Sequence, residues 1–203
     1  MAQILKILKN HKMNIDEKMV YLEGCGIYYD MVGKNSKAQD YYKKGLMISQ
    51  KFHRSEALIT SLYNIGWIYF KEKKYQRAEI YFRKSLNLVK EGDLFNEGTA
   101  LLRLGQIEML KGNLSIAQNY LKRSLKNFQI LGFVYWERIA LRALSELYIL
   151  LGRKKKALWF ALEADKTELM LNIEPNNSIF LHLYYGELAL VEKALKDKRR
   201  QIC

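Results

Sequence analysis

Residues 62–82 read LYNIGWIYFKEKKYQRAEIYF, and three other segments of the chain align with them. They are LEGCGIYYDMVGKNSKAQDYY at 22–42, LLRLGQIEMLKGNLSIAQNYL at 101–121 and LRALSELYILLGRKKKALWFA at 141–161. Each segment has an alanine at the same place, and the steps between successive alanines are 40, 39 and 40 residues. A fixed period of this length indicates a protein built from stacked structural repeats.

Small residues occupy two fixed positions of every repeat, and this pattern has a physical cause. The alanines are Ala38, Ala78, Ala117 and Ala157, and a small residue stands twelve positions before each, at Gly26, Gly66, Gly105 and Ser145. Two helices of a hairpin approach closely only where side chains are small. The spacing therefore predicts one helical hairpin in each repeat, with both small residues at the contact between its helices.

A glycine stands near the expected turn in three of the four repeats, at Gly33, Gly112 and Gly152. Glycine adopts without steric cost the left-handed backbone conformation that ends many helices. The second repeat has Lys73 at this place. We therefore expect its turn to close differently from the other three.

The chain resembles the tetratricopeptide repeat family, whose pattern is a large residue, Leu, Gly and Tyr on the first helix and Ala, Phe and Ala on the second. The second repeat matches this pattern with Leu62, Ile65, Gly66, Tyr69, Ala78, Phe82 and Ser85. The first repeat matches with Leu22, Cys25, Gly26, Tyr29, Ala38, Tyr42 and Gly45, and the other two match more loosely. The resemblance implies an all-α solenoid of stacked antiparallel helical hairpins that binds a partner.

Two departures from the family narrow the resemblance. The repeats are 39–40 residues long, whereas about 34 is usual, and the proline that ends the second helix in the family is replaced by Gln50, Lys90, Gln129 and Leu169. Both departures predict longer helices. They are similar to the arrays of the Gram-positive peptide-pheromone receptors of the Rap/NprR/PlcR type, which implies the sensor domain of a peptide-responsive bacterial regulator in quorum sensing.

We expect the whole chain, residues 1–203, to form one solenoid domain whose four hairpins span residues 16–171. The expected helices are 16–32, 35–52, 55–71, 75–90, 94–111, 114–131, 134–151 and 154–171. Residues 1–15 are expected to hold part of a preceding helix. Residues 172–203 are expected to hold a capping helix near 177–197 and a basic tail.

Composition excludes several classes of protein. Hydrophobic residues make up 49% of the chain and charged residues 27%, which is too apolar for a disordered protein. The net charge of +13 raises the chance of an acidic partner, although we expect most of it to solvate the outer face. The two cysteines, Cys25 and Cys203, have no disulfide or metal-site spacing. No apolar run reaches the roughly 18 residues that span a bilayer, so we expect a cytoplasmic protein without a membrane span.

No constellation of residues points to catalysis. The three histidines, His11, His53 and His182, fall in three different elements, and no metal-binding, phosphate-binding or dinucleotide-binding motif occurs. We therefore expect a protein that is not an enzyme and needs no cofactor and no metal. The basic clusters at 153–156 and 193–200 lack the interleaved exposed aromatics of single-strand nucleic-acid readers. Nucleic-acid binding through this domain is accordingly not expected.

The first helices of a tetratricopeptide array line its inner face, so the resemblance implies a binding surface there. The candidate peptide-binding residues are Tyr63, Asn64, Trp67, Phe70, Thr99, Arg103, Gln106, Arg142 and Glu146, with Tyr184 from the last helix. An Asn amide can donate to and accept from a peptide backbone at once, and Arg can clamp a carboxylate. Trp67 is the expected hydrophobic anchor. Asn64 and Arg103 are expected to project from the packed interface.

Asn64 and Arg103 also match two positions of the family members that clamp a C-terminal carboxylate. The Lys and Asn partners of that clamp are replaced by Glu23 and Ile27, which argues against a clamp of that kind. A second interpretation is that Asn64 and Arg103 only bridge neighbouring helices.

The sequence therefore favours a module that binds a peptide or protein on its inner face. The alternative is a structural assembly scaffold that joins larger proteins through its outer or terminal faces. Self-association into a homodimer is left open by the sequence.

Overall fold

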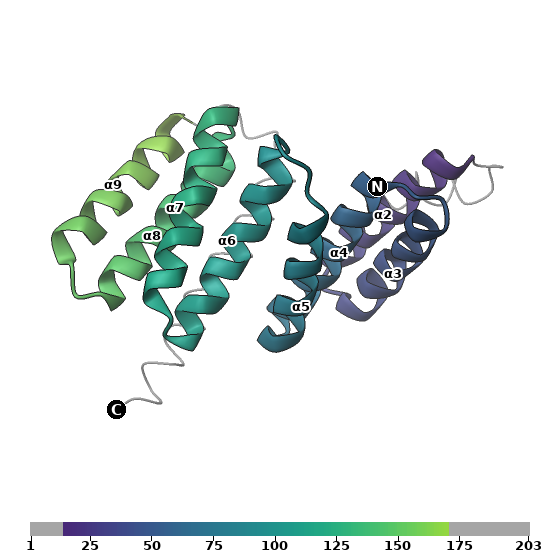
Figure 1. Ribbon diagram of the computed structural model, residues 1–203, viewed down its shortest axis with the longest axis horizontal. Helices are drawn as coiled ribbons and strands as arrows, with labels where there is room; N and C mark the ends of the chain where they lie inside the picture. Colours follow the sequence, from purple (N-terminus) through teal and green to yellow (C-terminus); the bar gives the residue numbers. More distant parts are fainter. Residues whose placement is uncertain (1–13, 171–203) are drawn as a thin grey trace. The chain divides into compact units, whose positions relative to one another are not determined.

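The computed structural model describes residues 14–170, with side chains through residue 167, and this part of the chain consists of eight α-helices without a strand (Figure 1). The helices are α2 (Ile15–Met31), α3 (Asn35–Lys51), α4 (Ser55–Lys71), α5 (Tyr75–Leu88), α6 (Leu94–Lys111), α7 (Leu114–Leu131), α8 (Val134–Leu150) and α9 (Lys154–Met170). Their ends lie within two residues of the expected ones. The segments expected before residue 14 and after residue 171 lie outside the described residues.

Helices that follow one another in sequence pack together, as a solenoid requires. α2 packs on α3, α3 on α4 and α4 on α5, and further along the chain α7 packs on α8 and α8 on α9. The chain forms two compact units, Met1–Arg103 and Leu104–Cys203, which divide within α6. The expected all-α solenoid is confirmed, and a single domain over the whole chain stays a prediction.

The first three hairpins close where the small residue of the first helix meets a large side chain of the second. A Cβ atom added to Gly26 would lie 2.2 Å from the Tyr42 ring. One added to Gly66 would lie 2.9 Å from the Phe82 ring. In the fourth hairpin the Ser145 hydroxyl instead donates to the Ala157 carbonyl at 2.8 Å. Small residues are thus needed at this position because the partner side chain fills the space that a Cβ would take.

The turn at Lys73 closes in the same way as the glycine turns, so the expectation of a different turn is wrong. Lys73 has a φ of 59°, close to the 73° of Gly33. Lys73 N–H donates to the Phe70 carbonyl at 2.9 Å, and the next amide donates to the Tyr69 carbonyl at 2.9 Å. The turn at Gly33 has the same pair of bonds, at 3.0 and 2.8 Å. These bonds satisfy carbonyls at the helix end and hold a lysine in a backbone conformation that glycine adopts more easily.

Asn14 fixes the start of α2 through a capping box. Its side chain accepts a hydrogen bond from Glu17 N–H at 2.9 Å, and the Glu17 carboxylate accepts one from Asn14 N–H at 2.9 Å. Both bonds satisfy amides that have no partner inside the helix. Because α2 begins here, its register places Glu23 and Asp30 two and four turns further on.

Candidate functional site

The predicted binding residues fall in both compact units. Tyr63, Asn64, Trp67 and Phe70 on α4 and Thr99 and Arg103 on α6 belong to the first unit, and Gln106 on α6 and Arg142 and Glu146 on α8 belong to the second. Tyr184 lies outside the described residues. The two groups are therefore described separately, beginning with the first unit.

Arg103 does not project from the packed interface, contrary to expectation. Its side chain is 0% exposed. Its Nε donates to the Tyr63 hydroxyl at 3.2 Å, and its guanidinium carbon lies 4.4 Å from the centre of the Trp67 ring. A guanidinium over an indole face is an attractive arrangement, and it strengthens away from water. Arg103 thus bridges α6 and α4, which agrees with the second interpretation of this residue.

Trp67, the expected hydrophobic anchor, is part of a buried polar network. It is 7% exposed. Its indole Nε1 donates to the Asp30 carboxylate on α2 at 3.1 Å, and Lys71 forms an ion pair with the same carboxylate. Lys71 also donates to the Asn35 side chain on α3 at 3.2 Å. A carboxylate buried this far requires such donors, so the network ties three helices of the first unit together.

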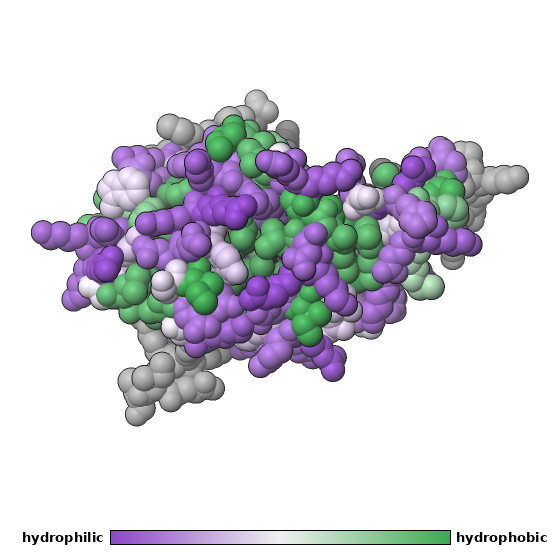
Figure 2. Space-filling model, in the orientation of Figure 1, coloured by the Kyte–Doolittle hydropathy of each residue, from purple (hydrophilic) through white to green (hydrophobic). Residues whose placement is uncertain are grey.

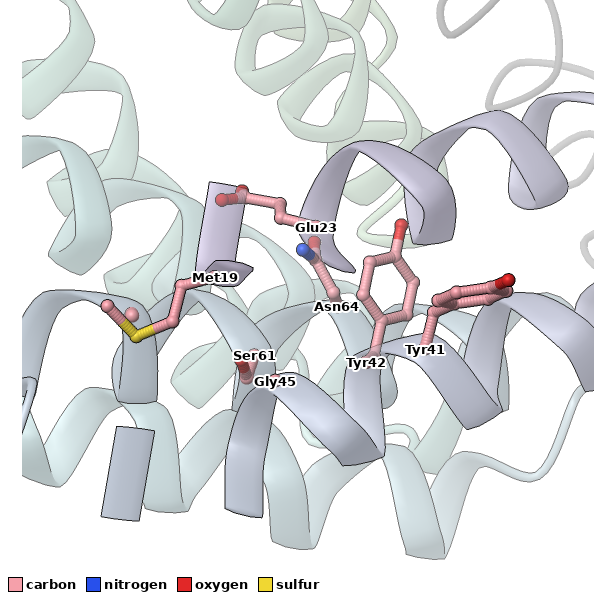
Figure 3. A pocket seen from close by; sticks show the side chains of 8 residues that line it. Met19, Glu23, Tyr41, Tyr42, Gly45, Ser61 and Asn64 are labelled. Carbon is pink, nitrogen blue, oxygen red and sulfur yellow. The ribbon is translucent and has the colours of Figure 1, made fainter. Parts of the chain in front are cut away.

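Asn64 is the predicted residue of this unit that lies at a pocket. The pocket is a small cavity of about 20 Å³ between α2, α3 and α4, with room for about one water molecule. Its lining residues are Met19, Glu23, Tyr41, Tyr42, Gly45, Ala57, Ser61 and Asn64. Figure 3 shows Met19 and Glu23 on one side, the two tyrosines on the other and Asn64 between them.

The pocket is rich in hydrogen-bond acceptors that have no partner. Within the described part of the chain, neither the Glu23 carboxyl nor the Asn64 amide forms a side-chain hydrogen bond or an ion pair. Burial raises the pKa of the Glu23 carboxyl. Burial, and then the charge of Glu23, raises the pKa of the neighbouring Tyr42 hydroxyl. A carboxylate without a cation in such surroundings favours an N–H donor or an ammonium group brought by a ligand.

Sequence reasoning named Glu23 only as the residue that replaces a clamp lysine, and it missed this pocket. A signal was present, because Glu23 and Asn64 occupy adjacent positions of the repeat on successive first helices. The ion pair between Asp30 and Lys71 was also missed. These two residues lie 41 positions apart, close to one repeat length, so a search for opposite charges at the repeat period could have found them.

In the second unit the predicted residues are less enclosed, apart from Gln106, which is buried. Arg142 and Glu146 are partly exposed and stand four residues apart on one face of α8. The Arg142 guanidinium lies 3.6 Å from the Asp165 carboxylate on α9, whose side chain is largely exposed. An ion pair open to water adds little stability. This part of the predicted surface is thus polar and partly exposed, with the Arg142 Nε and Glu146 Oε2 atoms themselves buried.

Among residues 14–167, no group of three or more His, Cys, Asp or Glu side chains is placed to hold a metal ion. None of the helices in the described part is both long and apolar enough to cross a bilayer.

Comparisons with known proteins agree with this architecture. The tetratricopeptide repeat family model matches residues 32–91, a stretch that holds α3, α4 and α5. No curated protein matches the chain significantly. Among solved structures, the chain is similar to BtubC (BKLC) from P. vanneervenii, with 21% identity, a TM-score of 0.68, and coverage of 86% of this chain and 73% of that one. Likeness at this identity shows the fold alone. Residues 32–91 thus match the tetratricopeptide repeat family, and the fold is an all-α array of helical repeats.

Proposed function

We propose that this chain is a binding module that takes an extended segment of a peptide or partner protein on the face of α2 and α4 that carries the Glu23–Asn64 pocket. Tetratricopeptide repeats generally mediate protein–protein interaction, and the family match at residues 32–91 supports that class. The observation that carries the proposal is the pair of partly buried polar side chains, Glu23 and Asn64, that share one pocket without partners.

The chemistry of the pocket selects the kind of segment. An extended backbone presents N–H and C=O groups at every residue, and the Asn64 amide can pair with both. Glu23 accepts only, so it suits an ammonium, a guanidinium or a backbone N–H. Such a donor would also offset the cost of holding an ionised carboxyl in a partly buried place. A segment with Lys, Arg or a free amino terminus therefore fits better than one that ends there in a carboxylate.

The buried residues Arg103 and Trp67 are expected to position α4 rather than to contact the ligand. Arg103, Tyr63 and Trp67 hold α4 and α6 in a fixed relation through their mutual contacts. A binding surface on rigid helices loses less conformational entropy on association than a loop does. In the second unit Arg142 and Glu146 stay predicted contacts, because both side chains are polar and partly exposed.

A narrower form of the proposal is the sensor domain of a peptide-responsive bacterial regulator. The repeat length of 39–40 residues, which is similar to that of the peptide-pheromone receptors, supports it. A gene for a short secreted peptide beside the gene for this chain would favour this form. The absence of such a neighbour in every genome that carries the chain would count against it.

The test uses fluorescently labelled hexapeptides that differ only in a central Lys, Gln or Glu. Fluorescence anisotropy should show the tightest binding for the Lys peptide. Glu23→Gln and Asn64→Ala should each weaken it by about one decade, the value of one or two hydrogen bonds. Glu56→Gln, at an exposed carboxylate on α4, removes the same charge away from the pocket and should leave affinity unchanged.

Two outcomes would contradict the proposal. Equal binding of all three peptides would show that the Glu23 carboxyl does not select the ligand. Full binding by a Glu23→Gln, Asn64→Ala double variant would exclude the pocket and favour the scaffold alternative, in which only outer or terminal faces contact a partner.

A further inference from the structure

The outer face of α9 departs from the repeat in a way that the inner-face proposal does not use. Leu158, Trp159 and Leu162 are 62%, 55% and 51% exposed. The equivalent residues are Gln39, Asp40 and Lys43 on α3, Glu79, Ile80 and Arg83 on α5, and Gln118, Asn119 and Lys122 on α7. This face is thus polar or mixed in the first three hairpins and apolar in the fourth.

The polar residues that α9 lacks have a clear role in the earlier hairpins. On α3, Lys43 donates to Gln39 at 3.1 Å, and on α5, Arg83 pairs with Glu79 at 2.8 Å. Each is a pair four residues apart, of the kind that stabilises a helix surface, whereas on α7 the equivalent Gln118 donates to the Tyr148 hydroxyl of α8 at 2.6 Å. Leu158 and Leu162 stand at the same two places on α9. The polar pair on this face of α3 and α5 is therefore replaced by two leucines on α9.

The packing of the second unit does not require these side chains. The buried side of α9 is formed by other residues, among them Ala157 at 5% and Ala164 at 0% exposure. Leu158 and Leu162 follow each other by one helical turn on the opposite side. An apolar group that stays in water gains nothing from burial, so packing within the hairpin does not account for this face.

Trp159 is held by its neighbours although it is exposed. Its ring meets the Phe160 ring edge-on with centres 4.7 Å apart. Phe160 in turn stacks on Tyr148 of α8 at 5.2 Å, nearly parallel. A tryptophan that is supported in this way loses little freedom when a partner covers it, and tryptophan is the side chain most enriched at binding hot spots.

The charges around this face are positive. Lys154, Lys155 and Lys156 are exposed, and within the described residues neither Lys154 nor Lys155 forms an ion pair. They stand in the first turn of α9, where positive charge opposes the helix dipole. The acidic residues nearest in sequence are already paired, Glu163 with Lys166 at 2.6 Å and Asp165 with Arg142 at 3.6 Å. An acidic partner would complement this field.

We propose that the α9 patch, defined as Leu158, Trp159 and Leu162 with Lys154 and Lys155, docks an acidic amphipathic helix of a partner protein. Apolar anchors at i and i+4 match the spacing by which one helix packs on another. Figure 2 shows hydrophobic surface set among hydrophilic side chains over α8 and α9, at the left of the view.

Two other occupants fit the α9 patch less well. A membrane-binding helix carries its apolar stripe along its length, whereas the stripe on α9 ends after one turn, between Lys155 and Lys166. A second copy of this chain carries the same sign of charge, with a net +13. The acidic helix is therefore the occupant that both the shape and the charge of the patch favour.

The experiment uses the full chain and a labelled designed peptide of about 18 residues, with Leu on one helical stripe and Glu elsewhere. The control peptides have the same composition with the stripe scrambled, and the same stripe with Lys in place of Glu. The test variant is Leu158→Gln, Trp159→Asn, Leu162→Lys, which gives α9 the residues of α7. The matched control is Ile80→Asn, which removes an apolar side chain that is 52% exposed on α5.

We expect the acidic amphipathic peptide to bind the parent chain and the Ile80→Asn variant equally. The triple variant should bind it at least about tenfold more weakly, the loss typical of a hot spot, although one substitution adds a positive charge. The double variant Lys154→Glu, Lys155→Glu should also bind the acidic peptide more weakly. It should bind the control peptide that has Lys in place of Glu more tightly. Circular dichroism should show that both variants stay folded. Asn64→Ala should bind the acidic peptide as the parent does, which separates this site from the inner face.

Several results would overturn the inference. One is that the triple variant binds the acidic peptide as tightly as the parent chain does, and another is that the parent binds the scrambled peptide equally well. A third is that the parent binds phosphatidylserine vesicles and not the peptide, and that the triple variant loses this vesicle binding. A concentration-dependent dimer of the parent chain, absent in the triple variant, would make a second copy the occupant instead.

Discussion

Two glycines that stand two positions apart, Gly24 and Gly26, have opposite surroundings. A Cβ added to Gly24 meets nothing within 4 Å, whereas one added to Gly26 would lie 2.2 Å from the Tyr42 ring. Gly26→Ala should therefore lower the free energy of unfolding by about 1–3 kcal/mol, the usual cost of overpacking. Gly24→Ala should raise it by about 0.5–1 kcal/mol, because alanine favours the helix interior. Thermal unfolding measures both.

The reverse order of these two variants would mean that α2 packs on α3 through another face. Gly66→Val tests the same contact in the second hairpin, where a Cβ would lie 2.9 Å from Phe82. It should be destabilising in the same way and by a similar amount.

The Glu23 carboxyl gives stability a pH dependence whose sign can be worked out. Burial raises its pKa above the ordinary 4.5, so the folded chain favours the protonated form. Below about pH 4.5 the carboxyl is neutral in both states, and above the raised pKa its ionisation costs stability. Glu23→Gln should therefore stabilise the chain at pH 7, and the gain should vanish by about pH 4. Urea unfolding at both pH values measures it, and a loss of stability at pH 7 would show that the ionised carboxyl has a stabilising partner.

The turns determine where each helix ends, and they explain why the helix bounds could be predicted so closely. Five described helices, α3, α4, α5, α7 and α8, have no side-chain hydrogen bond at the N-cap. Their starts are set by the preceding turn instead, with its left-handed residue and paired hydrogen bonds. The 39–40-residue period fixes the place of that turn, so the sequence pattern located it even at Lys73, where the glycine is missing.

A substitution at Lys73 in the turn of the second hairpin should make the chain more stable. With a φ of 59°, a lysine there carries a steric cost that glycine lacks. Lys73→Gly should raise the free energy of unfolding by a few tenths to about 1 kcal/mol, after the entropy that glycine adds to the unfolded chain is subtracted. Chemical denaturation measures it, with Lys74→Gly as the control at a neighbour that has a negative φ of −83°. A loss of stability in Lys73→Gly would mean that the lysine side chain contributes more than the backbone strain costs.

The candidate site was only partly predictable, and the reason lies in contacts between elements. The repeat pattern correctly placed Asn64 and Trp67 on one helix and Arg103 on the next first helix. It could not show that Arg103 turns back onto Trp67, or that Trp67 donates to Asp30. Those contacts depend on the distance and rotation between neighbouring helices, which a pattern within one repeat does not encode.

Among the described helices, packing runs mainly between neighbours in sequence. In the first unit α2 contacts α3, α3 contacts α4 and α4 contacts α5, and α2 also contacts α4. In the second unit α7 contacts α8 and α8 contacts α9. Arrays of this kind are stabilised by the repeats and by their nearest-neighbour contacts, so they can open locally.

A local defect should therefore stay local. Gly26→Ala should speed amide hydrogen exchange in α2 and α3 and leave α8 and α9 as they are in the parent chain, because the contact that it disturbs is with Tyr42 on α3. Ser145→Val removes the hydroxyl that donates to the Ala157 carbonyl at 2.8 Å, and it should speed exchange in α8 and α9 while sparing α2 and α3. Hydrogen exchange read by mass spectrometry, peptide by peptide, gives both maps.

A uniform rise in exchange along the chain in both variants would show that the array unfolds as one cooperative body. In that case a ligand at the Glu23–Asn64 pocket would stabilise α9 as much as α2, whereas local opening confines its effect to the helices that it touches.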